Sequence, residues 1–125
     1  MRITVTTGTC TITNPRFTIL SVGLAEMRAL ERWCDIFIFQ GLILSTFRWL
    51  IDSDKVLIAD IYNPFHLEQL EQAKDLGAEG RARTVSDCTT ALNDQLTRGD
   101  FFLCASEKQR DFWLGHLAAL GRQRG

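Results

Sequence analysis

The sequence predicts an α/β fold with a mainly parallel sheet, because three short apolar runs are separated by longer amphipathic segments. The runs cover residues 34–40, 55–62 and 100–105, and each is nearly continuous in apolar side chains. Strands of parallel sheets have this composition because helices cover both faces of the sheet. Alternation of such strands with helical segments is typical of α/β domains. We therefore expect three parallel strands, each buried on both faces.

The first third of the chain combines β-forming residues with one amphipathic helix. Residues 3–7 and 10–13 are rich in Thr, Val and Ile, which favour strands. A helix with a charged outer face is expected over residues 23–33. Its apolar side chains recur at helical spacing: Leu24, Met27 and Leu30.

A helix is expected on each side of the second strand. Residues 42–51 predict a short helix, followed by a turn at 52–54. Its inward side chains are Leu42, Phe47 and Leu50. After the strand, Asn63 is a favourable N-cap and Pro64 suits the first position of a helix over 64–76. The inward side chains of that helix are Leu67, Leu70, Ala73 and Leu76.

Glycines divide the second half of the chain. Residues 77–83 predict a loop or helix break and begin with the glycine that ends the preceding helix. A further helix follows and closes at Gly99. Its inward side chains are Val85, Cys88, Leu92 and Leu96. The last helix begins at a capping box of Ser106 and Gln109 and ends at Gly121. Its inward side chains are Trp113, Leu117 and Leu120.

The composition is that of an ordinary globular protein with one domain, which we expect to span residues 1–125. The 125 residues are 46% apolar and 23% charged, with a formal net charge of −1. A nucleic-acid partner is not expected, because phosphate binding needs clustered Lys and Arg. The pairs Arg81 with Arg83 and Arg122 with Arg124 are interpreted as solvated helix ends.

The four cysteines predict a reduced, cytoplasmic protein. They form no C-x-x-C motif and no histidine stands at metal-finger spacing, so no metal site is expected. Cys34 and Cys104 lie in apolar, strand-like runs, where a free cysteine packs as a small hydrophobic side chain. The start of the chain lacks the apolar run of a signal peptide, and residues 36–51 are too interrupted to span a bilayer.

Polar side chains follow all three expected strands, at residues 40–41, 60–64 and 106–109. Ligands of open parallel sheets bind beyond the carboxyl ends of the strands, so these positions predict a ligand crevice. Asp60 is interpreted either as a catalytic carboxylate or as a loop cap. His66 is interpreted either as a general base at the crevice or as a surface histidine.

The start of the last helix leaves further alternatives open. The backbone amides after Ser106 offer an anion site, although capping alone explains this serine. Lys108 and Arg110 are either phosphate contacts or exposed helix charges. Trp113 is either a core side chain or a contact for a protein partner, and His116 is interpreted as structural.

Three segments in this order resemble bacterial glycosyltransferases of family 4. They cover residues 58–73, 92–96 and 99–122, and the resemblance as a whole runs over 32–122. It is to the acceptor-side, N-terminal half of a GT-B enzyme. It implies an incomplete, Rossmann-like three-layer domain with a mainly parallel sheet, facing a second half that binds the nucleotide-sugar. It implies no cofactor.

The resemblance implies an acceptor cleft built from two segments. Its residues would be Asp60, Tyr62, Asn63, His66, Ser106, Glu107, Lys108 and Arg110. The family pattern is Asp-x-Tyr-Asp-Pro, and Asn63 replaces its second aspartate here. This departure removes one carboxylate from the cleft. The resemblance assigns a catalytic role to no residue of the chain.

By the same resemblance, the chain is the acceptor-side piece of a retaining enzyme that transfers a sugar from a nucleotide-sugar to an acceptor hydroxyl. The implied partners are that donor, bound by a further domain, an acceptor sugar or lipid-linked sugar, and a protein that supplies the donor half. Transfer needs both halves, so we expect no activity from this chain alone. The alternatives are a non-catalytic Rossmann-like binding or interaction module and a decayed gene fragment. The resemblance implies that the protein acts in the cytoplasm, either in solution or at the membrane surface.

Overall fold

The computed structural model describes residues 2–5 and 17–122 of the chain. The chain divides into two compact units, Met1–Asp35 and Ile36–Gly125. The expectation of one domain over the whole chain stays a prediction. Among the described residues, no helix combines the length and the apolar character needed to cross a bilayer.

The first unit contains a two-stranded sheet and one helix. Strand β1 (Arg2–Val5) pairs in parallel with β2 (Thr18–Ser21). Helix α1 (Leu24–Trp33) follows, and it buries Met27 and Leu30 as their spacing predicts. The first predicted strand is found as β1, whereas the second lies outside the described residues. The sequence pattern of residues 18–21 did not predict β2.

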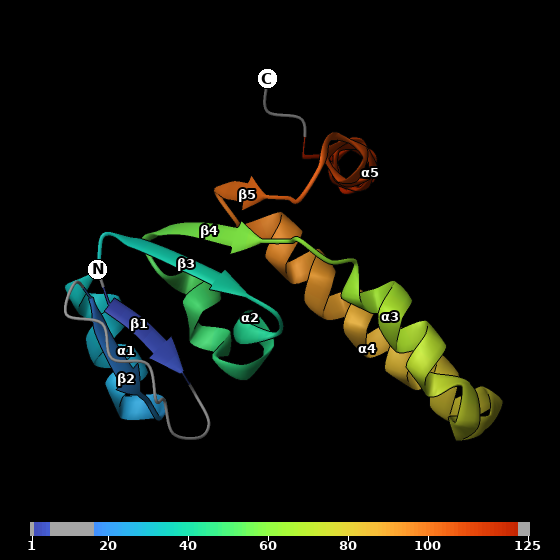
Figure 1. Ribbon diagram of the computed structural model, residues 1–125, viewed down its shortest axis with the longest axis horizontal. Helices are drawn as coiled ribbons and strands as arrows, with labels where there is room; N and C mark the ends of the chain where they lie inside the picture. The colour runs from blue at the N-terminus through green and yellow to red at the C-terminus, as the bar shows by residue number, and fades with distance from the viewer. Residues whose placement is uncertain (1, 6–16, 123–125) are drawn as a thin grey trace. The chain divides into compact units, whose positions relative to one another are not determined.

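The second unit is built on a three-stranded parallel sheet, as predicted (Figure 1). Its strands are β3 (Ile36–Gln40), β4 (Val56–Asp60) and β5 (Phe101–Leu103), in the spatial order β3-β4-β5. The register pairs the last residues of all three strands with one another. The carboxyl ends of the strands therefore lie at one edge of the sheet.

A broken helix connects β3 to β4. The single helix predicted over 42–51 is a short helix, α2 (Ile43–Thr46), followed by a 3-10 helix, η1 (Arg48–Asp52). Phe47 separates the two with a non-helical conformation of φ −117° and ψ 68°. Phe47 and Leu50 are buried as predicted.

A helical hairpin connects β4 to β5. Helix α3 (Phe65–Gln72) continues into a 3-10 helix, η2 (Ala73–Leu76), and α4 (Gly77–Arg98) packs back along α3 (Figure 1). The predicted loop over 77–83 is wrong, because these residues form the first turns of α4. The chain reverses at Gly77, which adopts a positive φ of 69°. Glycine adopts this left-handed conformation without steric strain because it has no Cβ atom.

The start of α3 and several helix faces also differ from the prediction. Pro64 rather than Asn63 occupies the N-cap position. The Nδ2 atom of Asn63 instead donates to a carboxylate oxygen of Glu68 at 3.0 Å.

Four leucines expected to point inward are exposed, three of them at the ends of their elements: Leu24, Leu42, Leu67 and Leu76. Three predicted core positions of α4 are buried: Cys88, Leu92 and Leu96.

Helix α5 (Glu107–Ala119) begins as predicted. The hydroxyl of Ser106 accepts a hydrogen bond from the Gln109 amide at 3.3 Å. Trp113 is buried, which confirms its interpretation as a core side chain. Two other predicted core side chains are only half-buried: Leu117 and Leu120.

Two cysteines of the second unit are free thiols: Cys88 and Cys104. Cys34 is half-buried at the C-terminal end of α1, and Cys104 is exposed just after β5. The prediction that both lie within buried strands is therefore wrong, because each strand is shorter than its apolar run. Cys10 lies outside the described residues.

Within the described residues of the second unit, helices cover one face of the sheet and leave the other open. The buried face carries Phe39, Leu57 and Ala59. The opposite face is apolar but exposed: Ile36 is 54% exposed, Ile38 62% and Phe101 63%. The spatial order of the strands is the same as their order along the chain. Crossover connections of the same handedness then lie on the same face of the sheet. In Figure 1, α2 and α4 lie on this one face. The prediction that these strands are buried on both faces is wrong.

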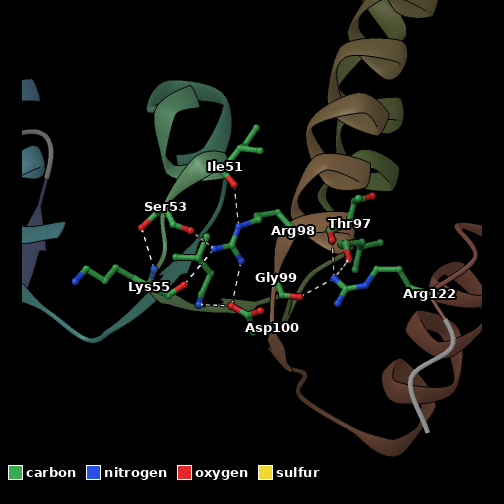
Figure 2. Close-up of polar contacts among 10 residues, drawn as sticks. Ile51, Ser53, Lys55, Thr97, Arg98, Gly99, Asp100 and Arg122 are labelled. Carbon is green, nitrogen blue, oxygen red and sulfur yellow. Dashed lines mark hydrogen bonds and ion pairs between the residues drawn. The ribbon is translucent and has the colours of Figure 1, made fainter. Parts of the chain in front are cut away.

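An arginine at the end of α4 holds the segment that leads into β4 (Figure 2). Arg98 donates to three carbonyl oxygens, those of Ile51 at 2.9 Å, Ser53 at 2.6 Å and Lys55 at 3.1 Å. It also pairs with Asp100 at 3.1 Å. Arg98 thereby fixes the start of β4 relative to the end of α4.

Asp100 makes the matching contact at the start of β5. Its carboxylate accepts from the Leu57 amide at 2.8 Å, and its own amide donates to the Leu57 carbonyl at 2.7 Å. The hydrogen bond from Leu57, and after it the contact with Arg98, holds the pKa of Asp100 below its ordinary value. These contacts set the register of β4 against β5.

Arg122 closes the C-terminal end of α4. It donates to the carbonyl oxygens of Leu96 at 2.8 Å, Thr97 at 2.7 Å and Gly99 at 2.6 Å (Figure 2). Such carbonyls lack partners within the helix. The interpretation of Arg122 as a solvated helix end is therefore wrong.

Replacing Asp100 with asparagine should reduce the loss of stability in acid. A carboxyl whose folded pKa is lowered stabilises the fold above the ordinary aspartate pKa of about 3.9. That contribution disappears as the pH falls from there through the folded pKa. We expect the free energy of unfolding, measured with urea and circular dichroism, to fall more steeply below about pH 4 in the wild type than in Asp100→Asn. Asp54→Asn is the control, because its side chain is 88% exposed. Equal slopes for wild type and Asp100→Asn would contradict the assignment.

Candidate functional site

A cavity lies at the carboxyl ends of β3 and β4, where the sequence predicts a ligand crevice. Its volume is about 410 Å³. Its lining residues are Gln40, Gly41, Leu42, Tyr62, Asn63, Phe65, Gln69 and Cys88. They come from the end of β3, the loop after β4, and helices α3 and α4. The helical hairpin therefore forms one wall of the cavity.

A buried amide side chain of α4 holds the turn after β3. Gly41 adopts a φ of 69°, and its carbonyl accepts a hydrogen bond from Nε2 of Gln95. Gln95 is only 2% exposed, and a buried amide needs such a partner. Gln95 was not predicted as a site residue, although it is a polar residue on the apolar face of α4, between Leu92 and Leu96. Gln95 thus ties the edge of the cavity to α4.

The side chains that line the cavity are uncharged. Its polar groups are three amides and one phenol: Gln40, Asn63, Gln69 and Tyr62. Amide and phenol groups both donate and accept hydrogen bonds, so they suit an uncharged ligand with several hydroxyl groups. Burial, and after it the carboxylate of Asp87, raises the pKa of the Cys88 thiol. Cys88 is therefore protonated at neutral pH and is not an activated nucleophile.

The cavity includes some of the residues predicted for the first segment and not others. Tyr62 and Asn63 line it. Asp60 ends β4 in register with Gln40 and does not belong to the lining. His66 is turned toward α5, where its ring stacks on Phe112 with 6.1 Å between the ring centroids. Neither Asp60 nor His66 therefore lines the cavity, and His66 contacts α5 instead.

The second predicted segment reaches the cavity wall through Gln109. The Nε2 atom of Gln109 donates to the Tyr62 carbonyl at 2.7 Å, and its Oε1 atom accepts from the Ala105 amide at 2.8 Å. The capping box predicts that this side chain returns to the amide of Ser106. That half of the prediction is wrong, because the side chain spans from Ala105 to the neighbouring loop.

The other residues predicted at the start of α5 lie outside the cavity. Ser106 caps the helix, and Glu107 and Lys108 are exposed. Arg110 pairs with Asp111 at 3.2 Å and lines a separate, smaller cavity of about 250 Å³ between β5 and α5. Within the described part of the chain, no three His, Cys, Asp or Glu side chains are grouped to hold a metal ion.

Comparisons of the sequence with models of protein families and with curated proteins, and of the fold with solved structures, found no match. The resemblance to family 4 glycosyltransferases stays a prediction. Its support is the three segments of the sequence described above.

The variant Gln109→Glu should separate the two contacts of this side chain. A carboxylate still accepts from the Ala105 amide and suits the first turn of a helix, but it cannot donate to the Tyr62 carbonyl. We expect the carbonyl carbon resonance of Tyr62 to shift and the free energy of unfolding to fall by about 0.5–1.5 kcal/mol. Lys108→Glu is the control, because it adds a carboxylate one residue away. An unchanged Tyr62 resonance in Gln109→Glu would show that this hydrogen bond is not formed in solution.

Proposed function

We propose that the second unit is the acceptor-side part of a GT-B-type glycosyltransferase of the Rossmann-like class, and that its cavity holds an uncharged sugar acceptor. The observation that carries the proposal is the position of the cavity at the carboxyl ends of two parallel strands, with an uncharged lining of amides and Tyr62. Ligand crevices of open α/β sheets lie at this edge. The resemblance over residues 32–122 supports the same assignment.

The proposed unit binds and positions the acceptor, and the donor half supplies the remaining chemistry. The protonated Cys88 and the amides of the lining provide no general base at neutral pH. Stabilisation of the leaving diphosphate would come from a donor-binding half outside these 125 residues. The unit alone is therefore proposed to bind acceptor without transferring sugar. The proposed place of action is cytoplasmic, in solution or at the membrane surface.

A second candidate function is an interaction module. The observation that favours it is the exposed apolar face of the sheet, which carries Ile36, Ile38 and Phe101. Contiguous exposed apolar surface often marks a binding face for another protein. This function would use the face opposite the helices and would not require the cavity.

The two functions are separated by a matched pair of variants. We expect neutral monosaccharides and disaccharides to shift amide resonances of residues 40–42 and 62–69 in an NMR titration, and uronic acids to shift them less. Tyr62→Ala should weaken binding roughly two- to tenfold, as expected for the loss of one aromatic contact. Phe101→Ala should leave sugar binding unchanged, because Phe101 lies 63% exposed outside this cavity.

Absence of sugar-induced shifts at residues 40–42 and 62–69 would contradict the acceptor site and would leave the interaction module, which does not require the cavity. Addition of a candidate donor half should produce release of nucleoside diphosphate that depends on Tyr62. Nucleotide-sugar turnover by the purified 125-residue chain would overturn the proposed division of labour.

A further inference from the structure

His66, in the first turn of α3, is in contact with three rings of α5. It stacks on Phe112 at 6.1 Å between centroids and 23° between planes. Trp113 lies 6.3 Å away, and His116 lies 6.1 Å away with its ring edge-on at 68°. Helices α3 and α5 follow different strands, so this cluster joins two separate connections of the fold.

The α5 side of the cluster is itself anchored to α4. Nε2 of His116 lies 2.9 Å from Oδ1 of Asn93, and Trp113 stacks on His116 at 6.2 Å between centroids. Trp113 is 3% exposed. The cluster therefore ties α3, α4 and α5 together around the ring of His66.

The surroundings of His66 favour its neutral form. Its Nδ1 atom is buried and meets no hydrogen-bond partner among the described residues. Burial, and after it the charge of His116, lowers the pKa of His66. Some acidic side chains on the packed helices are engaged elsewhere: Glu68 accepts from Asn63, and Asp94 pairs with Arg48. On α5, Asp111 pairs with Arg110.

We propose that His66 is an acid-sensitive latch, which holds α5 against α3 while its ring is neutral and releases α5 when the ring is protonated. Protonation places a positive charge on a partly buried ring beside His116, without an acceptor for the new N–H group. Release of α5 also withdraws Gln109 from the Tyr62 carbonyl. The latch thus connects pH to the wall of the cavity through groups that do not line it.

The direction of the pH effect follows from linkage. In the released state His66 has the ordinary histidine pKa of about 6.5, and in the latched state its pKa is lower. The latch is fully effective above about pH 6.5 and weakens as the pH falls from there through the lowered pKa. Each unit between the two pKa values changes the latching equilibrium tenfold.

Amide hydrogen exchange of the intact chain tests the latch. After correction for the intrinsic pH dependence of exchange, protection of α5 amides should fall between pH 7.5 and pH 5, while β4 amides keep theirs. The fall approaches, and cannot exceed, ten raised to the difference between 6.5 and the His66 pKa, which an NMR titration of the imidazole measures independently. Unchanged protection of α5 over this range would overturn the proposal.

Two variants separate the latch from general acid sensitivity. His66→Phe keeps a stacking ring that cannot be protonated, so α5 protection should become independent of pH over this range. His116→Gln removes the like charge, so the pKa of His66 should rise and the fall in protection should shrink. A fall of the same size in His66→Phe would overturn the proposal. If His66→Phe does not fold, a wild-type His66 pKa at or above 6.5 overturns the proposal and a lower one, matched by the exchange data, supports it.

Discussion

The pairing of Arg98 with Asp100 is the constraint on which the second unit depends. Arg98 donates hydrogen bonds to carbonyl groups of the segment that enters β4, and Asp100 is hydrogen-bonded to both the amide and the carbonyl of Leu57. The strands are parallel, so contacts that fix where they begin also fix where they end. The cavity lies at the opposite edge of the sheet, where β4 ends in register with β3.

A second arginine extends this constraint to α5. Arg122 follows α5 and binds the last carbonyl groups of α4, including those of Thr97 and Gly99. At its other end, α5 is joined to the loop after β4 by Gln109. The aromatic cluster around His66 lies between these two attachments. Because Arg122 keeps the far end of α5 in place, a change at His66 acts on the near end, where Gln109 meets Tyr62.

The sequence predicted the positions of β3, β4 and β5 because each lies in a short, nearly continuous run of apolar residues. It did not predict which face is covered, since apolar side chains show what a strand can bury and not where its connections run. The glycines of 77–83 suggested a break, although only Gly77 needs an unusual φ. The site was located from the strand ends. Gln95 and Arg98 were missed because their partners are backbone carbonyls, which every sequence supplies.

Asn63 keeps the cavity lining uncharged, so the lining can bind a ligand but offers no charged group to activate it. Its Nδ2 atom donates to Glu68 at 3.0 Å, so asparagine and glutamate form a matched pair at the start of α3. An aspartate at this position, as in the family pattern, would place two carboxylates in contact and raise the pKa of one of them. With Asn63 the lining stays uncharged, and His66 is directed away to α5. Any charge needed for reaction at this cavity would therefore come from outside its lining, as the proposed dependence on a separate donor-binding half requires.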